Sequence, residues 1–173
     1  MSKGVFDQVK RKVLVISAIA VLIAFTIVSC SSPCPEMGKS APDFTLQSTD
    51  GENVNLSDFQ GKTVIMNFWA TWCGPCQLET PFFQAIQNEQ GDKGVVILAI
   101  DIKENATTVK NFANSKKITF TILLDADAKV AQKYCIPNVL PVTLFINAEG
   151  IIKATKVGAF QSKAEIESIL DSM

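Results

Sequence analysis

Two cysteines, Cys73 and Cys76, are the residues whose type and spacing point most directly to chemistry. They stand in Trp-Cys-Gly-Pro-Cys, between an apolar run over residues 63–69 and a segment of helical pattern that extends to about Asn88. A cysteine at the start of a helix faces free backbone N–H groups and the positive end of the helix dipole, and both favour the thiolate. We therefore expect Cys73 to be a low-pKa nucleophile and Cys76 to resolve the mixed disulfide that Cys73 forms.

A zinc site and a structural disulfide are the alternative interpretations of a Cys-x-x-Cys motif. Zinc sites built from cysteine need a second pair of ligands, but the sequence contains no second Cys-x-x-Cys motif and no histidine. The lack of histidine also excludes Ser-His-Asp and Cys-His catalysis. A structural disulfide would not explain this motif at a strand–helix junction. The sequence therefore predicts dithiol–disulfide exchange that needs neither a metal nor a cofactor.

The length and the charge of the chain exclude other classes of protein. Its 173 residues are enough for one domain of ordinary size together with a targeting segment. With 16 basic and 17 acidic residues the net charge is −1, and there is no basic stripe of the kind that nucleic-acid-binding proteins use. We expect no nucleic-acid partner.

The N-terminal segment has the pattern of a membrane address. A leader with basic residues precedes the apolar run 13–28, and Ile-Val-Ser-Cys at 27–30 resembles a bacterial lipobox. By that resemblance Cys30 is lipidated and becomes the mature N-terminus, as in a lipoprotein; the alternative is an uncleaved signal anchor. Both place the later residues on the extracytoplasmic (periplasmic) side of the cell membrane, because the positive charges stay inside. The predicted parts are a signal peptide or membrane segment (1–29), a tether linker (30–39) and one domain (40–173).

Strand and helix patterns alternate through that domain. Asp-Gly at 50–51, between two short alternating runs, predicts a β-hairpin, and the apolar run 63–69 predicts a strand buried on both faces. Ser162 and Glu165 predict a capping box at the start of the last helix. The patterns predict an α/β fold, a mixed β-sheet flanked by helices. Its strands are expected at 44–46, 53–56, 63–69, 95–100, 119–124, 142–146 and 151–157, and its helices at 73–88, 107–116, 129–134 and from 162 onward.

Three motifs carry a resemblance to a known family. They are Ala-Pro-Asp-Phe at 41–44, the segment 67–76 that includes the two cysteines, and Leu-Pro-Val-Thr at 140–143. With them, nearly all of the domain resembles the TlpA/ResA family of membrane-anchored thiol–disulfide oxidoreductases, within the thioredoxin superfamily. The resemblance implies a thioredoxin-like fold with an N-terminal β-hairpin and a central helical insertion at 104–117.

The resemblance also implies roles for residues around the cysteines. Pro141 is expected to be a cis-proline that faces the disulfide, and Trp72, Leu140 and Pro141 to form the substrate-binding surface. Asn67 stands where thioredoxin has a buried aspartate, and an amide cannot transfer a proton. Glu79 fits the glutamate that ResA-like proteins place near their cysteines, and it lies one helical turn after Cys76. We expect Glu79 to accept a proton and to tune the thiol pKa; the alternative is an ordinary surface charge.

The Gly-Pro pair between the cysteines bears on the direction of electron flow. It resembles thioredoxin, a reductant of about −270 mV, rather than the strong oxidants near about −120 mV. We therefore expect a disulfide reductase that acts on a protein disulfide and receives electrons from a membrane thiol-reducing carrier. By family resemblance, apocytochrome c is a candidate substrate, and cytochrome c-type biogenesis is a candidate process.

Two rival functions stay open at this level. Ala-Pro-Asp-Phe also opens peroxiredoxin-type thiol peroxidases, but Met66 and Ala70 stand where those enzymes have proline and threonine. A non-catalytic thioredoxin-fold binding module is the other rival. A copper chaperone of this kind would need Cys-x-x-x-Cys with histidine or methionine ligands, but Cys73 and Cys76 form Cys-x-x-Cys and the sequence contains no histidine.

The roles of the two remaining cysteines are also open. Cys34 lies in the predicted linker, where we expect an idle thiol or an adventitious disulfide. Cys135 follows a short helix, where a buried and inert free cysteine is expected. The total of five cysteines is odd, so one chain cannot pair them all.

Overall fold

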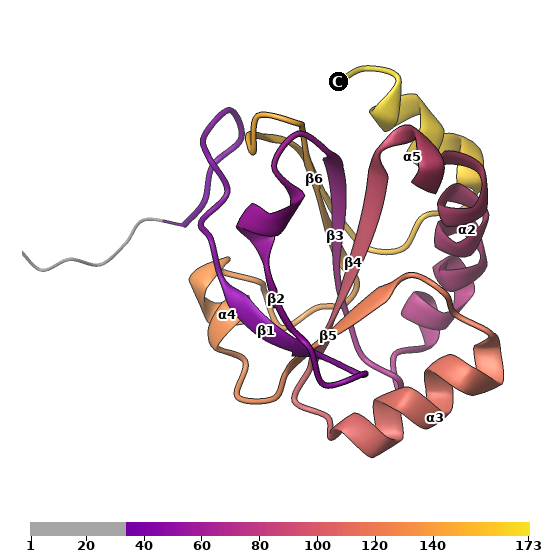
Figure 1. Ribbon diagram of the computed structural model, residues 1–173. Coiled ribbons are helices and arrows are strands. Elements are labelled where there is room, and N and C mark those ends of the chain that lie inside the picture. The colour runs from indigo at the N-terminus through magenta and orange to yellow at the C-terminus, as the bar shows by residue number, and fades with distance from the viewer. Residues whose placement is uncertain (1–33) are drawn as a thin grey trace, which may run out of the picture. The chain divides into compact units, whose positions relative to one another are not determined.

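A seven-stranded mixed sheet forms the centre of the computed structural model, which describes residues 34–173 (Figure 1). The strand order is β2-β1-β5-β4-β3-β6-β7, in which β3, β4 and β5 are parallel and the other pairs are antiparallel. The strands are β1 Thr45–Ser48, β2 Asn53–Asn55, β3 Thr63–Trp69, β4 Val95–Ile102, β5 Thr121–Asp125, β6 Val142–Ile146 and β7 Ile152–Val157. The helices are α2 Gly74–Gln90, α3 Ala106–Lys116, α4 Lys129–Lys133 and α5 Lys163–Leu170, with the 3₁₀ helices η1 Leu56–Phe59 and η2 Gly91–Lys93.

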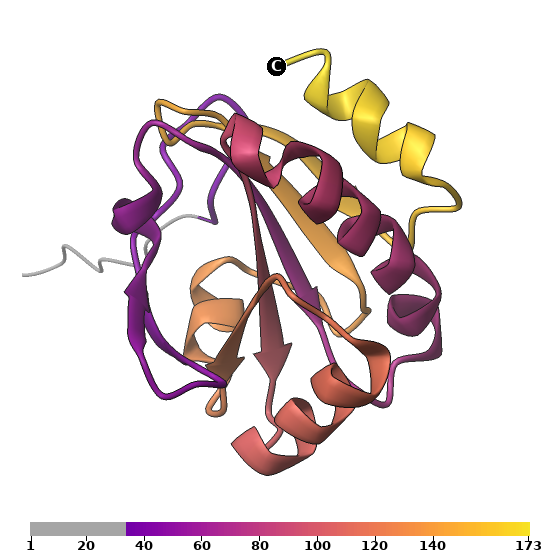
Figure 2. The ribbon, with the colours of Figure 1, turned by 45° about the vertical axis from the view of Figure 1, so that its right-hand side comes forward.

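The two faces of the sheet are covered by different helices. Residues of α2, α3 and α5 pack on one face, and Figure 2 shows α2 and α5 running side by side there. The other face packs against α4, Phe44 and Leu56. Along β3, Ile65 and Trp69 are buried on the α2 face, and Phe68 is buried on the α4 face. This two-sided burial explains why β3 is a nearly continuous apolar run.

The fold class expected from the sequence is confirmed, and the differences are local. Strand β2 ends at Asn55, which is the N-cap residue of η1. The backbone N–H of Asn55 bonds to the carboxylate of Asp58 within η1 (2.8 Å), and this bond ends the strand one residue earlier than expected. Strand β5 begins at Thr121, two residues late, because the N–H of Thr119 bonds to the side chain of Gln84 on α2 (2.9 Å). Both differences arise from side chains that compete for backbone groups at the ends of strands.

The predicted capping box of the last helix is wrong. Ser162 occupies the N-cap position of α5, but its side chain makes no capping hydrogen bond. The carboxylate of Glu165 instead accepts a hydrogen bond from the N–H of Gln161 (3.3 Å) and pairs with Lys156 (3.6 Å).

The segment that precedes the hairpin is fastened to the domain. The N–H of Gly38 bonds to the carbonyl of Ile152 (2.8 Å), and the N–H of Ile152 bonds to the carbonyl of Lys39 (2.9 Å). Cys34 and Cys135 form a disulfide that closes 101 residues of sequence. The described part of the expected tether is therefore attached at two places. The other predictions for the N-terminus, including the role of Cys30, lie outside the described residues.

The expectation that Cys135 is a buried free thiol is wrong. Helix α4 ends just before it, and the N–H groups of Cys135 and Ile136 bond back to the carbonyls of Gln132 (3.0 Å) and Ala131 (2.9 Å). Cys135 takes a left-handed backbone conformation (φ 52°), which is a common way to end a helix. Its side chain is exposed, so it is accessible to Cys34.

Within residues 34–173, no helix is both long and apolar enough to cross a membrane.

Candidate active site

Cys73 lies at the junction between the central strand β3 and helix α2. It is the N-cap residue of α2, with extended backbone (φ −79°, ψ 104°), and its Sγ accepts a hydrogen bond from the N–H of Cys76 (3.2 Å). Pro75 lies in the first turn, where its missing N–H costs no helical hydrogen bond. The sulfur therefore occupies the position at which free N–H groups and the helix dipole stabilise a negative charge.

The two cysteines are joined in a disulfide in this structure. Their Cα atoms are 5.3 Å apart, and both residues are at least 95% buried. Of the pair, Cys73 lines an open groove of about 590 Å³ and Cys76 does not. An incoming disulfide can therefore approach Cys73 through the groove, whereas Cys76 is buried away from the groove.

The groove brings together some of the expected substrate-binding residues. Trp72 is 70% exposed and lines the groove from one side, and Leu140 lines it from the other, next to α4. The peptide bond between Leu140 and Pro141 is cis. The carbonyl of Pro141 is already bonded to the N–H of Gly158 (2.8 Å), so it does not offer a free acceptor. Asn138 and Leu140 line the groove, and residues 138–140 make no backbone–backbone hydrogen bond within the described part of the chain.

Glu79 is buried on the same inner face of α2 as Cys76, with 1% of its surface exposed. Glu79 is therefore not an ordinary surface charge, which was the alternative interpretation. Burial raises the pKa of Glu79 to about 7, against the opposing effects of two hydrogen bonds and the charge of Lys156. Such a group exchanges its proton near neutral pH, as a base for the buried Cys76 thiol requires.

The hydrogen-bond partners of Glu79 come from two other parts of the fold. One carboxylate oxygen accepts a hydrogen bond from the side-chain amide of Asn67 on β3 (3.0 Å), and the other accepts one from the N–H of Phe160, before α5 (2.9 Å). The same amide nitrogen donates to the hydroxyl of Thr143 on β6 (2.9 Å). Sequence reasoning noticed that Asn67 cannot transfer a proton but missed that it holds Glu79. Thr143 could have been found from the sequence because it belongs to the Leu-Pro-Val-Thr motif. Nothing in the sequence pointed to Phe160.

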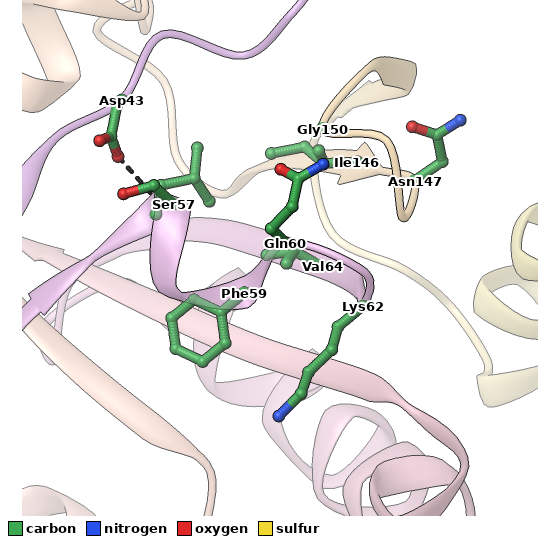
Figure 3. Close-up of a pocket in the computed structure, with 10 residues that line it drawn as sticks. Asp43, Ser57, Phe59, Gln60, Lys62, Val64, Ile146, Asn147 and Gly150 are labelled. Carbon is green, nitrogen blue, oxygen red and sulfur yellow. Dashed lines mark hydrogen bonds between the residues drawn. The ribbon is translucent and has the colours of Figure 1, made fainter.

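A second cavity, of about 60 Å³, lies at the other end of β3 (Figure 3). It is lined by residues including Val64 at the start of β3 and Gly150 in the turn before β7. On one side the carboxylate of Asp43 accepts a hydrogen bond from the N–H of Ser57 (3.0 Å), as Figure 3 shows. This bond joins the segment before β1 to η1. No residue that lines this cavity also lines the groove at Cys73, so the cavity has no part in the active site.

Comparisons with known proteins bear on this geometry. The family model described as Redoxin matches residues 36–171. The chain belongs to the redoxin family. Among curated proteins, this redoxin is similar to the thiol-disulfide oxidoreductase ResA of Bacillus thuringiensis (strain Al Hakam), with 34% identity over 78% of this chain and 77% of the relative. It is also similar to ResA of Bacillus subtilis (strain 168), with 40% identity over 69% of this chain and 65% of the relative.

A solved structure gives the same result for the fold. The putative thiol:disulfide interchange protein DsbE from Chlorobium tepidum matches with a TM-score of 0.75 and 27% identity, over 80% of this chain and 97% of that one. The redoxin is therefore a thiol–disulfide oxidoreductase of the thioredoxin fold. No group of three or more cysteine, aspartate or glutamate side chains within residues 34–173 is arranged to hold a metal ion.

The raised pKa of Glu79 makes a prediction about stability. Since the folded-state pKa (about 7) exceeds the ordinary value of 4.5, the native protein binds more protons than the unfolded chain between these pH values. The free energy of unfolding should therefore fall as pH rises from 4.5 to 7, by about 3 kcal/mol for this group alone. Glu79→Gln should remove this fall. Urea unfolding of the oxidised wild type and variant at pH 4.5, 6 and 8 measures the difference, and Glu149→Gln, at an exposed glutamate, is the control. A difference between wild type and Glu79→Gln that does not change with pH would contradict the assignment.

Proposed function

We propose that this redoxin is a membrane-tethered, extracytoplasmic reductase of protein disulfides. The observation that carries the proposal is the position of Cys73, which caps α2 and lines the groove beside Trp72 and Leu140. A nucleophile there meets its substrate in the groove while Cys76 and Glu79 stay buried behind it.

The reaction follows from this arrangement. In the reduced enzyme, the Cys73 thiolate attacks one sulfur of the substrate disulfide, a bond forms between the two sulfurs, and a substrate thiolate leaves. Cys76 then loses its proton to the Glu79 carboxylate and attacks Sγ of Cys73. The mixed disulfide breaks, the second substrate thiolate leaves, and Cys73–Cys76 closes. Two electrons pass to the substrate, whose thiolates take up protons.

The groove favours an extended polypeptide segment as the substrate. Residues 138–140 offer unpaired backbone groups to such a segment, and main-chain pairing of this kind gives affinity with little sequence preference. Exposed Trp72 and Val139 (55% exposed) add apolar surface for the side chains next to the disulfide. By the family resemblance, the cysteine pair of apocytochrome c is the candidate substrate.

The direction of electron flow is inferred from the residues between the cysteines. The Gly-Pro pair is that of thioredoxin, whose potential of about −270 mV suits reduction of other disulfides. A reductase that works outside the cytoplasm becomes oxidised in each cycle. It therefore needs a membrane thiol carrier to return two electrons to Cys73 and Cys76.

Cysteine usage supports the proposed location. The exposed disulfide between Cys34 and Cys135 is of a type that persists in oxidising compartments. With Cys73 and Cys76 also paired, four of the five cysteines have partners within the chain. Cys30, at the end of the apolar run, is the one that remains for lipid attachment.

Removal of either active-site sulfur separates the two roles. Cys76→Ser should accumulate a mixed disulfide with a protein substrate such as insulin, because the attacker is present and the resolver is absent. Cys73→Ser should form none, and both variants should lose catalysis of insulin reduction by dithiothreitol. The assay is insulin turbidity together with non-reducing mass spectrometry.

The double variant Cys34→Ser/Cys135→Ser is the matched control and should keep the catalysed reduction. Trapping by Cys73→Ser instead of Cys76→Ser would reverse the assigned roles. A wild-type protein that consumes peroxide but leaves insulin oxidised would favour the peroxidase.

Lipid attachment at Cys30 predicts the mature N-terminus. The membrane-bound protein should begin at Cys30 and carry the mass of a diacylglycerol group, because lipobox processing cleaves before the modified cysteine. Mass spectrometry of the N-terminal peptide gives the answer, and Cys30→Ser should abolish both cleavage and lipid. Peptides from residues 13–29 in most of the membrane-bound protein would leave the uncleaved anchor instead.

A further inference from the structure

The segment that leads into Cys73 is held by a glutamate that follows strand β4. The carboxylate of Glu104, just after β4, accepts hydrogen bonds from the backbone N–H (2.5 Å) and the hydroxyl (2.6 Å) of Thr71. The carbonyl of Thr71 accepts a further bond from the side chain of Gln77 on α2 (2.7 Å). Thr71 directly precedes Trp72, so these bonds fix the approach of the chain to Cys73.

Behind Glu104 lies a buried acid that the exchange mechanism does not use. Asp101, on β4, is fully buried, and neither of its carboxylate oxygens receives a hydrogen bond from an N–H or O–H group of the described residues. Its carboxyl group lies close enough to that of Glu104, three residues later, for the two to interact. Two carboxyl groups can form a hydrogen bond with each other only if one of them carries a proton.

The backbone between the two acids is bent to bring them together. Lys103 has a left-handed conformation (φ 64°), which is unfavourable for a residue with a side chain. A conformation of this kind persists where surrounding contacts over-determine it. Here, the contacts are the hydrogen bond from the N–H of Lys103 to the carbonyl of Asp125 (3.2 Å) and those that the next residue, Glu104, makes with Thr71.

Burial and hydrogen bonding identify Asp101 as the partner that keeps the proton, because Asp101 is fully buried whereas Glu104 is partly exposed and accepts two hydrogen bonds from Thr71. Burial raises the pKa of Asp101 to about 8, and the side chain of Glu104 and the charge of buried Asp125 on β5 add to this effect. The backbone N–H of Glu104 acts in the opposite direction and lowers the pKa. On the β3 side its partner in the sheet is Trp69, which does not titrate. Burial alone would raise the pKa of Glu104, but the hydrogen bonds from Asp101 and Thr71 outweigh it and lower the pKa.

We propose that Asp101 and Glu104 form a carboxyl pair that shares one proton and positions Thr71, and through it Trp72 and Cys73, for attack on the substrate. Protonated Asp101 donates a hydrogen bond to the Glu104 carboxylate, and both oxygens of Glu104 stay able to accept from Thr71. Loss of that proton places two negative charges against each other and weakens the hold on Thr71. Asp101 is thus a positioning residue of the exchange reaction, and this role does not depend on the substrate, the location or the direction proposed above.

The backbone amide of Thr71 reports on this pair directly. In the oxidised full-length protein in detergent, where Cys73 and Cys76 do not titrate, its proton resonance should lie far downfield at pH 6.5. Between pH 7 and 9.5 it should move upfield with a midpoint near that of Asp101. A resonance that stays constant over this range in the wild type would overturn the proposal without any variant.

Two variants identify the titrating group. Asp101→Asn retains a donor to Glu104 but has no titratable proton, so the Thr71 resonance should remain downfield throughout. Glu79→Gln, which removes the other buried carboxyl, should leave the transition in place. A transition that persists in Asp101→Asn, or disappears in Glu79→Gln, would contradict the assignment.

The reaction rate supplies an independent readout. For the reduced protein attacking a small disulfide, the ratio of the Asp101→Asn rate to the wild-type rate should rise at least threefold from pH 7 to pH 9, because only the wild type loses the hold on Thr71. A merely structural role would lower the rate by the same factor at both pH values. A ratio that does not change with pH would therefore count against the positioning role.

Discussion

The hydrogen bond from the N–H of Cys76 to Sγ of Cys73 is the contact on which the chemistry depends. It exists because β3 ends just before a helix that begins at Cys73, so that the sulfur replaces a capping oxygen. A strand at the edge of the sheet could not hold this junction as firmly. β3 lies between β4 and β6 and is buried on both faces, so the N-terminus of α2 has a rigid support.

Burial of polar groups next to that junction is the second constraint. A carboxyl group in an apolar layer is costly unless it is protonated or hydrogen-bonded. Glu79 meets this requirement with donors from β3 and from the segment before α5, and Asp101 meets it by sharing a proton with Glu104. The two acids lie on the same face of the sheet as the disulfide but serve different steps. In the proposed mechanism, Glu79 takes the proton of the resolving thiol and Asp101 fixes the position of the attacking one.

Much of this arrangement could be predicted from local patterns. The apolar run of β3, the motif at the start of α2 and the spacing of Glu79 from Cys76 are all readable within about one helical turn or one strand. Contacts between distant segments could not be predicted in this way. The bond between Cys34 and Cys135 spans 101 residues, and the donor at Phe160 is a backbone group that any residue would supply. In the sequence, Asp101 is one polar residue at the end of an apolar strand. Its interaction with Glu104 becomes visible only in the structure, where Lys103 between them has a left-handed backbone conformation.

The central claim is that the N-terminus of α2 makes Cys73 the reactive thiolate. Its most direct test is the rate of iodoacetamide alkylation of each cysteine in the reduced protein from pH 5 to pH 10, resolved by peptide mass spectrometry. Cys73 should react first, with an apparent pKa below the ordinary thiol value of about 8.5, and Cys76 should stay unlabelled at mildly acid pH. Preferential labelling of Cys76, or an ordinary thiol pKa for Cys73, would contradict the account.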